Sequence, residues 1–387
     1  MSQALEPALV ALRMSPGPAF VEELYGAWEQ GSAVLPLDPR LPAPEVQRIL
    51  EDMRPSALVE DAGRTRLSQA MPVDAGVALV VLTSGTTGGR KGAELTHAAL
   101  EASTRAAGAR LGVEDSDRWL CCLPLSHVAG LSTIVRSMAL GRPPVIHERF
   151  DPEAIAREER ATLVALVPTM LARLLDARVA VDRYRVILLG GGPAPAPLLE
   201  RARAAGANVV VSYGMTETCG GCVYDGVPFD DVEIAVAADG RIALRGPVVM
   251  SGYRNRPDLS ARVLSRGWFT TSDVGELDAR GRLTVTGRAD DVIITGGEKV
   301  VPAEVERELR RHPRVEDALV FGRADDLWGE RVVAMVVPAA GTEPPALEDL
   351  RRFIAGRMTA AGAPRELIVV DALPAQRSWK RGVRDPE

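Results

Sequence analysis

The stretch from Gly76 to Gly92 reads Gly-Val-Ala-Leu-Val-Val-Leu-Thr-Ser-Gly-Thr-Thr-Gly-Gly-Arg-Lys-Gly. Its first seven residues form a short apolar run, which is the pattern of a buried strand. Glycines and Ser/Thr hydroxyls follow, and Lys91 ends a loop whose backbone N–H groups can approach phosphate closely. The spacing differs from that of the phosphate loop of nucleoside triphosphatases. The stretch therefore predicts a strand that leads into a polyphosphate-binding loop.

Lysine is rare in this chain, in which only Lys91, Lys299 and Lys380 are lysines among 46 basic residues. A compact ammonium group and a flat guanidinium group are not interchangeable at a tight phosphate or carboxylate site. We therefore expect the three lysines to be chemically required. The alternative is that codon bias favours arginine over lysine throughout the chain and that these three lysines remain by chance.

Helical and strand patterns alternate around the loop, which indicates an α/β fold. We expect helices at 45–53 and 96–111, the second capped by Thr96, and buried strands at 161–168, 185–189 and 208–212. After about residue 229, short alternating runs indicate a β-rich region. A helix at 303–312 and strands at 318–321 and 332–337 then indicate an α+β unit. We predict a large N-terminal α/β domain, 1–289, and a small, mobile C-terminal domain, 290–387.

Composition narrows the class of protein. A chain of 387 residues exceeds the usual size of one hydrophobic core, so two domains are expected. The net charge is −6 and no basic block stands out, which argues against a nucleic-acid binder. No apolar stretch approaches the roughly 18 residues of a membrane span. The N-terminus lacks a basic head with an apolar signal core, so we expect a cytoplasmic protein.

The four cysteines are too few for a disulfide framework, although Cys219-Gly-Gly-Cys222 has redox or zinc spacing. A metal site needs two more well-placed ligands, which the adjacent Cys121 and Cys122 supply poorly. Small residues packed beside a binding loop explain the pair more simply.

Further motifs occur in a fixed order along nearly the whole chain. Together with the glycine-rich loop they resemble the adenylate-forming superfamily, which comprises acyl-CoA synthetases, peptide-synthetase adenylation domains and luciferases. The motifs are Gly31-Ser-Ala-Val-Leu-Pro-Leu-Asp-Pro-Arg40, Tyr213-Gly-Met-Thr-Glu-Thr218, Arg245-Gly-Pro247 through Gly252-Tyr253, Thr271-Ser-Asp-Val-Gly275 and Gly287-Arg-Ala-Asp-Asp-Val-Ile-Ile-Thr-Gly-Gly-Glu-Lys-Val300.

The resemblance implies an ATP site. Tyr213 would stack on adenine, Thr216 would touch the α-phosphate or the substrate carboxylate, and Glu217 would hold Mg²⁺, which prefers carboxylate oxygens. Asp273 would accept from the ribose hydroxyls, with Arg288 assisting. The implied ATP-binding residues are Thr83, Ser84, Gly85, Thr86, Thr87, Gly88, Lys91, Gly191, Gly192, Ser212, Tyr213, Gly214, Met215, Thr216, Asp273 and Arg288.

The resemblance also implies a catalytic lysine near the C-terminus, acting with Thr216 and Glu217. In the family this lysine lies six residues after a proline, and Pro374 and Lys380 keep that spacing although the glycine-rich turn between them is altered. The Lys380 ammonium would stabilise charge that develops as the carboxylate attacks the α-phosphate. Asp290 would be the hinge, and Gly296 and Gly297 would face the coenzyme A channel.

Three segments narrow the resemblance to the short actinobacterial 2-succinylbenzoate-CoA ligases of menaquinone biosynthesis: 123–131, 134–137 and 213–228. The implied activity is that of an acid-thiol ligase that uses ATP, Mg²⁺ and coenzyme A as co-substrate. Because an unpaired buried carboxylate is strongly disfavoured, the second carboxylate of the acid needs a partner. Arg136 is the candidate, with His127 and Gly190 also at the acid. The alternatives are an exposed helix arginine and a structural histidine.

Three other readings stay open at this point. The chain could act on another aryl or acyl acid, or it could be a catalytically silent nucleotide-binding homologue, which only the altered sequence around Lys380 favours. Loading of a carrier protein is disfavoured because no carrier module is evident. The expected partners are small molecules, and the sequence leaves open whether the protein forms a homodimer.

Overall fold

The computed structural model describes residues 7–83, 90–295, 298–325, 328–358 and 360–374. Contacts divide the chain into two compact units, which we describe separately. The first comprises Met1–Ile234, Leu244–Phe269 and Gly281–Leu283, and the second Ala235–Ala243, Thr270–Arg280 and Thr284–Glu387. The predicted fold class, α/β with a smaller C-terminal unit, is confirmed. The predicted domain boundary at 289/290 stays a prediction, since two short earlier segments group with the second unit.

The first sheet carries the strand of the glycine-rich stretch, which is β5 and was predicted at 76–82. Its central strands β1, β2, β3 and β5 run parallel, and β4, β6 and β16 pair antiparallel with their neighbours. The order is β16-β6-β5-β2-β1-β3-β4, with bounds Gly252–Tyr253, Lys91–Thr96, Val77–Thr83, Ala33–Pro36, Leu9–Arg13, Ala57–Glu60 and Gly63–Arg66.

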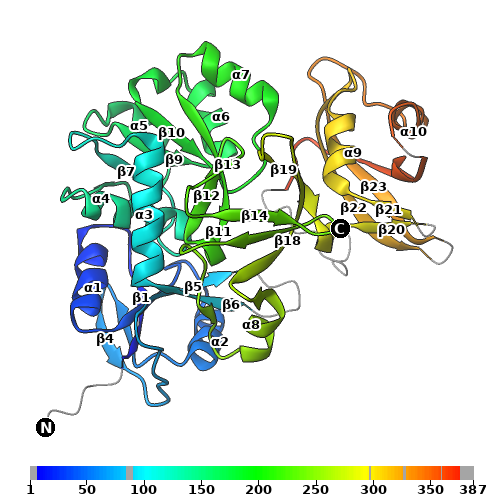
Figure 1. Ribbon diagram of the computed structural model, residues 1–387. Helices are drawn as coiled ribbons and strands as arrows, with labels where there is room; N and C mark the ends of the chain where they lie inside the picture. Colours follow the sequence, from blue (N-terminus) through cyan, green and yellow to red (C-terminus); the bar gives the residue numbers. More distant parts are fainter. Residues whose placement is uncertain (1–6, 84–89, 296–297, 326–327, 359, 375–387) are drawn as a thin grey trace, which may run out of the picture. The chain divides into compact units, whose positions relative to one another are not determined.

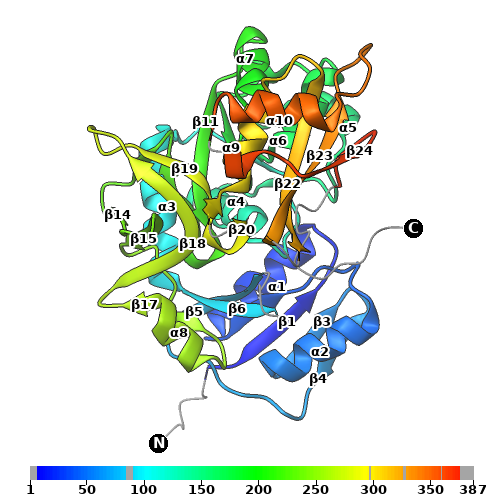
Figure 2. The same cartoon turned by 90° about the vertical axis from the view of Figure 1, so that its right-hand side faces the viewer.

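Helices cover both faces of this sheet because its central strands are apolar on both sides. Phe20 and Leu24 of α1 (Pro18–Glu29) pack in one core cluster, and Val46 and Ile49 of α2 (Ala43–Met53) pack in another. Figure 2 shows α1 and α2 beside this sheet. Helix α2 matches the helix predicted at 45–53.

The second sheet has the order β13-β12-β11-β10-β9-β7-β8. Strands β8, β7, β9, β10 and β11 run parallel, whereas β12 and β13 turn back antiparallel. The predicted strands at 161–168, 185–189 and 208–212 correspond to β9, β10 and β11. The bounds are Trp119–Cys121 (β7), Val145–Ile146 (β8), Leu163–Leu166 (β9), Val186–Leu189 (β10), Val209–Met215 (β11), Gly220–Tyr224 (β12) and Val227–Pro228 (β13).

Helix α3 contacts β12 and α4, and its cyan ribbon crosses the first unit in Figure 1. The predicted cap is confirmed, because the Thr96 hydroxyl accepts a hydrogen bond from the Ala99 N–H at 3.1 Å. The further helices of this unit are α3 (His97–Leu111), α4 (Val128–Ala139), α5 (Pro152–Arg157), α6 (Pro168–Asp176), α7 (Ala196–Ala204) and α8 (Pro257–Val263).

A third sheet has the order β14-β15-β18-β17, and β19 pairs with β18. It corresponds to the region of short alternating runs predicted after residue 229. Its strands are Glu233–Val236 (β14), Arg241–Arg245 (β15), Leu264–Ser265 (β17), Trp268–Leu277 (β18) and Leu283–Arg288 (β19).

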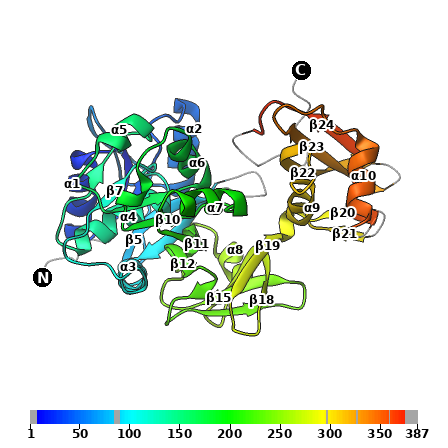
Figure 3. The ribbon, with the colours of Figure 1, turned by 90° about the horizontal axis from the view of Figure 1, so that it is seen from above.

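The fourth sheet belongs to the second unit and has the order β21-β20-β23-β22, with β24 beside β23. Helices α9 and α10 pack on it through Val305, Leu309, Leu350 and Ile354, and Figure 3 shows both helices beside it. The bounds are Ile293–Thr295 (β20), Glu298–Val300 (β21), Pro302–Leu309 (α9), Val315–Asp325 (β22), Gly329–Pro338 (β23), Leu347–Ala355 (α10) and Glu366–Val369 (β24).

Helix α9 ends three residues before the predicted end at 312. The N–H groups of Arg311 and His312 bond to carbonyls three residues earlier, so the last turn tightens before Pro313. In the described part of the chain, every helix falls short of the length and apolar character needed to cross a membrane.

Candidate active site

The glycine-rich loop leaves β5 and returns as β6, so its two ends lie opposite each other. Thr83 and Lys91 are paired across the β5–β6 hairpin. The Lys91 ammonium nitrogen lies 5.3 Å from the centroid of the Tyr253 ring, which is within cation–π range. The predicted phosphate-binding residues between them, Ser84, Gly85, Thr86, Thr87 and Gly88, lie outside the described residues.

A second group of predicted residues lies where β10 and β11 end. A β-carbon at Gly190 would lie 3.3 Å from the Ser212 carbonyl oxygen, so the backbone after β10 passes close to β11. A β-carbon at Gly214 would lie 2.1 Å from the Gly220 carbonyl oxygen, which admits only glycine there. The remaining predicted residues of the group are Gly191 and Gly192 after β10, and Tyr213, Met215 and Thr216 on and just after β11.

Glu217 lies in the short 3-10 turn Thr216–Thr218, directly after β11. Its side chain is buried, and its Oε1 accepts a 2.7 Å hydrogen bond from the Tyr253 hydroxyl. The Met250 N–H donates to the Glu217 carbonyl at 2.8 Å. Burial raises the pKa of the Tyr253 phenol, and the Glu217 carboxylate raises it further. The phenol therefore stays protonated and acts as a donor to the carboxylate.

Glu217 has the chemistry of a Mg²⁺ ligand. Its carboxylate supplies the hard oxygen atoms that Mg²⁺ prefers, and among the described residues only Tyr253 donates to it, through Oε1. The described part of the chain holds no group of three or more His, Cys, Asp or Glu residues placed to bind a metal ion. The residues present therefore fit a Mg²⁺ held by one carboxylate together with substrate phosphates, the usual arrangement at nucleotide sites.

Arg136 lies on α4 and is only 5% exposed, which excludes the alternative of an exposed helix residue. Its Nε and one terminal nitrogen have no hydrogen-bond partner among the described residues. The guanidinium carbon lies 5.7 Å from the centroid of the Trp119 ring. The buried Tyr224 hydroxyl likewise lacks a well-formed hydrogen bond in the described part of the protein. Burial raises the pKa of Tyr224, and Arg136 lies close enough to oppose that rise.

His127 precedes α4 and keeps an accessible side chain. Desolvation by neighbouring atoms lowers its pKa, Asp38 opposes this effect, and the charges of Arg90 and Arg40 lower the pKa further. The imidazole is therefore neutral near pH 7. The start of α4 lies close to the turn after β11, because a β-carbon at Gly220 would approach Ser132 Oγ to 3.8 Å.

The predicted ribose contacts lie in the second unit. Arg288 donates to Asp273 Oδ1 at 2.9 Å, and the Asp273 N–H donates to Thr271 Oγ1 at 3.0 Å. Arg288 thus orients the carboxylate, and Thr271 holds the backbone of Asp273, both from the same unit. The predicted coenzyme A contacts Gly296 and Gly297, the catalytic Lys380 and the side chain of the hinge residue Asp290 fall outside the described residues.

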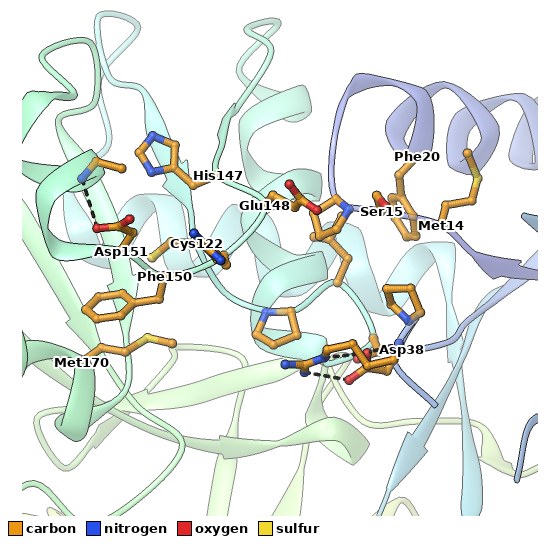
Figure 4. Close-up of a pocket in the computed structure, with 18 of the residues that line it drawn as sticks. Met14, Ser15, Phe20, Asp38, Cys122, His147, Glu148, Phe150, Asp151 and Met170 are labelled. Carbon is orange, nitrogen blue, oxygen red and sulfur yellow. Dashed lines mark hydrogen bonds and ion pairs between the residues drawn. The ribbon is translucent and has the colours of Figure 1, made fainter. Parts of the chain in front are cut away.

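A cavity of about 1060 Å³ opens in the first unit, and Figure 4 shows the residues around it. It is lined by segments that follow β1, β2, β7, β8 and β9. Open α/β sheets bind ligands at this carboxyl end of their strands. The predicted site residues are absent from its described lining, although Ser126 adjoins His127. The charged lining residues are Asp38, Arg40, Glu148, Arg149, Asp151, Arg157 and Glu158.

The four cysteines are free and buried. Burial raises the pKa of Cys121, Cys122, Cys219 and Cys222 to about 12. Such thiols stay protonated and unreactive at neutral pH, because only the thiolate is a nucleophile or metal ligand.

Two family models match the chain, one described as AMP-binding enzyme over residues 5–75 and 62–254, the other as AMP-binding enzyme C-terminal domain over 304–380. The chain belongs to the AMP-binding enzyme family. It is 47% identical over 350 residues to a probable 2-succinylbenzoate–CoA ligase of Mycobacterium tuberculosis, covering 86% of this chain and 90% of the relative. It is 36% identical over 386 residues to the 2-succinylbenzoate–CoA ligase of Bacillus subtilis, covering 93% and 78%.

Solved structures of this family are also similar to the chain. The o-succinylbenzoate CoA synthetase (MenE) of Bacillus subtilis in complex with the acyl-adenylate intermediate OSB-AMP has a TM-score of 0.83 and 32% identity, covering 97% of this chain and 87% of that one. The same enzyme in complex with ATP and magnesium ion has a TM-score of 0.82 and 31% identity, covering 98% and 89%. The predicted superfamily is therefore confirmed.

Sequence reasoning gave no role to two buried phenols of this AMP-binding enzyme, Tyr253 beside Glu217 and Tyr224 beside Arg136. Both tyrosines lie in segments that carry the family resemblance, Gly252-Tyr253 and 213–228. Tyr253 and Glu217 are 36 positions apart, so no helical or strand periodicity relates them. The pairing of β16 with β6 brings this motif to the phosphate-loop hairpin, and the bond from the Met250 N–H to the Glu217 carbonyl joins it to the turn after β11.

Proposed function

We propose that this protein is an AMP-forming ligase that activates 2-succinylbenzoate with ATP and transfers the acyl group to coenzyme A. The names of the Mycobacterium tuberculosis and Bacillus subtilis relatives support this reaction. The structural observation that carries the choice of acid is the buried, unpaired cation of Arg136.

A buried arginine almost always has an anionic partner, because an isolated charge is costly to remove from water. The described residues offer Arg136 no carboxylate, and its neighbours are the Trp119 ring and the Tyr224 phenol. A ligand carboxylate would supply the missing charge and accept from both the guanidinium and the phenol. The aromatic side chains would lie against a ring. An aryl acid with a second carboxylate meets these requirements.

The cavity in Figure 4 suits such an acid less well. Four carboxylates, of Asp38, Glu148, Asp151 and Glu158, line it against three arginines, so its charged lining is negative by one and does not favour a second carboxylate. The Asp38 carboxylate is already paired with Arg40, at 2.8 Å between Oδ2 and the terminal nitrogen. We therefore place the acid's second carboxylate at Arg136.

The chemistry has two steps. The aliphatic carboxylate of the acid attacks the α-phosphorus of ATP, the bond to the β-phosphate oxygen breaks, and acyl-adenylate and pyrophosphate form. The thiolate of coenzyme A then attacks the acyl carbon, and AMP leaves with the electron pair of the mixed-anhydride bond. Thr83 and Lys91 at the hairpin ends would hold the outgoing phosphates, and Asp273 with Arg288 would hold the ribose. Bound Mg²⁺ would neutralise phosphate charge beside Glu217.

Product identification tests this proposal. The purified protein would be given ATP, Mg²⁺ and coenzyme A with 2-succinylbenzoate, with 4-oxo-4-phenylbutanoate, which lacks the ring carboxylate, or with benzoate. We expect pyrophosphate release and an acyl-CoA product, identified by mass, with 2-succinylbenzoate, and a much lower kcat/KM with the other two acids.

Two outcomes would replace the proposal. Faster turnover of an acid without a second carboxylate would favour the ligase for another aryl or acyl acid. ATP binding measured by titration calorimetry, without pyrophosphate release for any acid, would favour the silent nucleotide-binding homologue.

Lys380 is proposed as the cation that stabilises the first transition state. We expect Lys380→Ala to slow adenylate formation by about a hundredfold or more, the usual effect of losing one such donor. Arg381→Ala is the matched control, because it removes a neighbouring charge and should leave adenylate formation near the parental rate. Parental adenylate formation by Lys380→Ala would remove this lysine from the mechanism.

Location and assembly are part of the same proposal. We place the enzyme in the cytoplasm, because ATP and coenzyme A are available there, and we propose a homodimer as one of the assemblies that the sequence leaves open. Sedimentation equilibrium at micromolar concentration tests the assembly, and a single species of monomer mass would contradict it.

A further inference from the structure

We infer that Tyr253 is a positioning residue that fixes the metal-binding carboxylate of Glu217 and links it to the phosphate-loop lysine. The inference rests on Glu217 as the Mg²⁺ ligand of the proposed reaction. It concerns the metal rather than the acid, so it can be tested without 2-succinylbenzoate.

The contacts of the phenol carry the inference. Its hydroxyl donates to Glu217 Oε1 at 2.7 Å, and its ring lies under the Lys91 ammonium at 5.3 Å. An ionised carboxylate can only accept hydrogen bonds, so the direction of this bond is fixed. One aromatic side chain therefore touches both predicted groups of the nucleotide site, one on its edge and one on its face.

Tyr253 is itself held firmly, as a positioning residue must be. Strand β16 pairs with β6, with Tyr253 opposite Ala93, and the Tyr253 N–H donates to Ser260 Oγ at 2.8 Å. The next residue, Arg254, is buried and donates to three backbone carbonyls. The phenol is 6% exposed and cannot swing into solvent without breaking this packing.

Fixing Oε1 has a consequence for the metal. With one oxygen held by the phenol, the plane of the Glu217 carboxylate is set and Oε2 presents its lone pairs in a defined direction. Among the described residues nothing else donates to this carboxylate. Partners of this kind orient metal ligands, and their loss usually costs about 10- to 100-fold in metal affinity.

The test removes only the hydroxyl. Tyr253→Phe keeps the ring, and with it the burial and the contact with Lys91. ATP binding would be measured by titration calorimetry over a series of Mg²⁺ concentrations and again in EDTA. We expect the Mg²⁺ concentration for half-maximal enhancement of ATP binding to rise about tenfold, while the Kd for ATP in EDTA stays within about twofold. Tyr184→Phe is the matched control, because it removes another buried hydroxyl, which accepts from Arg183 at 3.0 Å; it should keep the parental Mg²⁺ dependence.

A double-mutant cycle separates this role from general loosening of the fold. Glu217→Gln should itself raise the Mg²⁺ requirement, and adding Tyr253→Phe to it should change nothing more. A parental Mg²⁺ dependence in Tyr253→Phe would overturn the inference. An equal rise in both backgrounds would also overturn it, since Tyr253 would then act without Glu217. A parental Mg²⁺ dependence in Glu217→Gln would show that the metal ligand itself was wrongly chosen, leaving the choice of acid untouched.

Discussion

Two buried arginines of the first unit have almost the same exposure and opposite surroundings. Arg254 is 3% exposed, and its guanidinium donates to the carbonyls of Met53, Met71 and Pro72 and lies 3.5 Å from Glu94. Arg136 is 5% exposed, and two of its nitrogens have no described partner.

The difference separates a structural charge from a charge kept for a ligand. The hydrogen bonds of Arg254 tie β16 to the end of α2 and to the chain before β5, and they are made inside the protein. The Trp119 ring and the Tyr224 phenol lie beside Arg136, so among the described residues no anion compensates for the burial of its charge. Burial alone therefore does not identify a functional arginine, whereas a nearly complete burial without an anionic partner makes Arg136 a candidate.

The largest expected effect is on stability at Arg254. Arg254→Met leaves Glu94 and the carbonyls of Met53, Met71 and Pro72 without their cation, so we expect the free energy of unfolding to fall by about 3–5 kcal/mol. Burial already raises the pKa of Glu94, and Arg254 opposes that rise, so its loss should raise the pKa of Glu94 further. Denaturant titration measures the change. A loss below about 1 kcal/mol would contradict the comparison, because Arg254 would then contribute little to stability, as we expect of the unpaired Arg136.

The corresponding substitution at the second arginine is Arg136→Met. We expect the KM for 2-succinylbenzoate to rise about a hundredfold with the KM for ATP unchanged, because a charge-assisted contact to the acid is lost. Unfolding free energy should stay level or increase, since an unpaired buried charge is removed. Steady-state kinetics and denaturant titration of the same sample check both. Equal rises in the two KM values would remove Arg136 from the acid site.

A smaller effect is expected at another ion pair, between the buried Asp117 and the partly exposed Arg185. Burial by itself would raise the pKa of Asp117, but hydrogen bonds from Arg185, the Glu114 N–H and Thr162 outweigh it, and the net pKa is lowered from its ordinary value of 3.8. Since the unfolded state binds the proton more readily, this contribution is present above about pH 4 and is lost as pH falls through the folded pKa.

Asp117→Asn should therefore cost about 2 kcal/mol of unfolding free energy at pH 7 and less as the pH falls below 4. Denaturant titrations of parent and variant at pH 7, 4 and 2.5 measure this convergence. A difference that stays constant over the series would mean that ionisation of Asp117 contributes nothing to stability.

The sequence predicts local features of this molecule well and distant pairings poorly. The strand before the glycine-rich loop and the Thr96 cap of α3 depend on short-range periodicity and on one nearby hydrogen bond, so they were predictable. Whether Arg136 is exposed or buried depends on how α4 packs against β7 and β12. The sequence of α4 alone does not determine that packing. The contact of Tyr253 with Glu217 likewise depends on sheet order.

The smallest effect is predicted at Tyr224, and it tests whether the phenol shares the second carboxylate of the acid with Arg136. Tyr224→Phe keeps the aromatic wall beside Arg136 and removes one neutral hydroxyl, whose net hydrogen bond is worth about 0.5–1.5 kcal/mol. We expect the KM for 2-succinylbenzoate to rise about fivefold, with the KM for 4-oxo-4-phenylbutanoate unchanged because that acid lacks the carboxylate the phenol would meet. In the Arg136→Met background the same change should matter less, since both donors would serve one carboxylate. A uniform rise for both acids would mean that Tyr224 only shapes the wall, and that Arg136 alone holds the second charge.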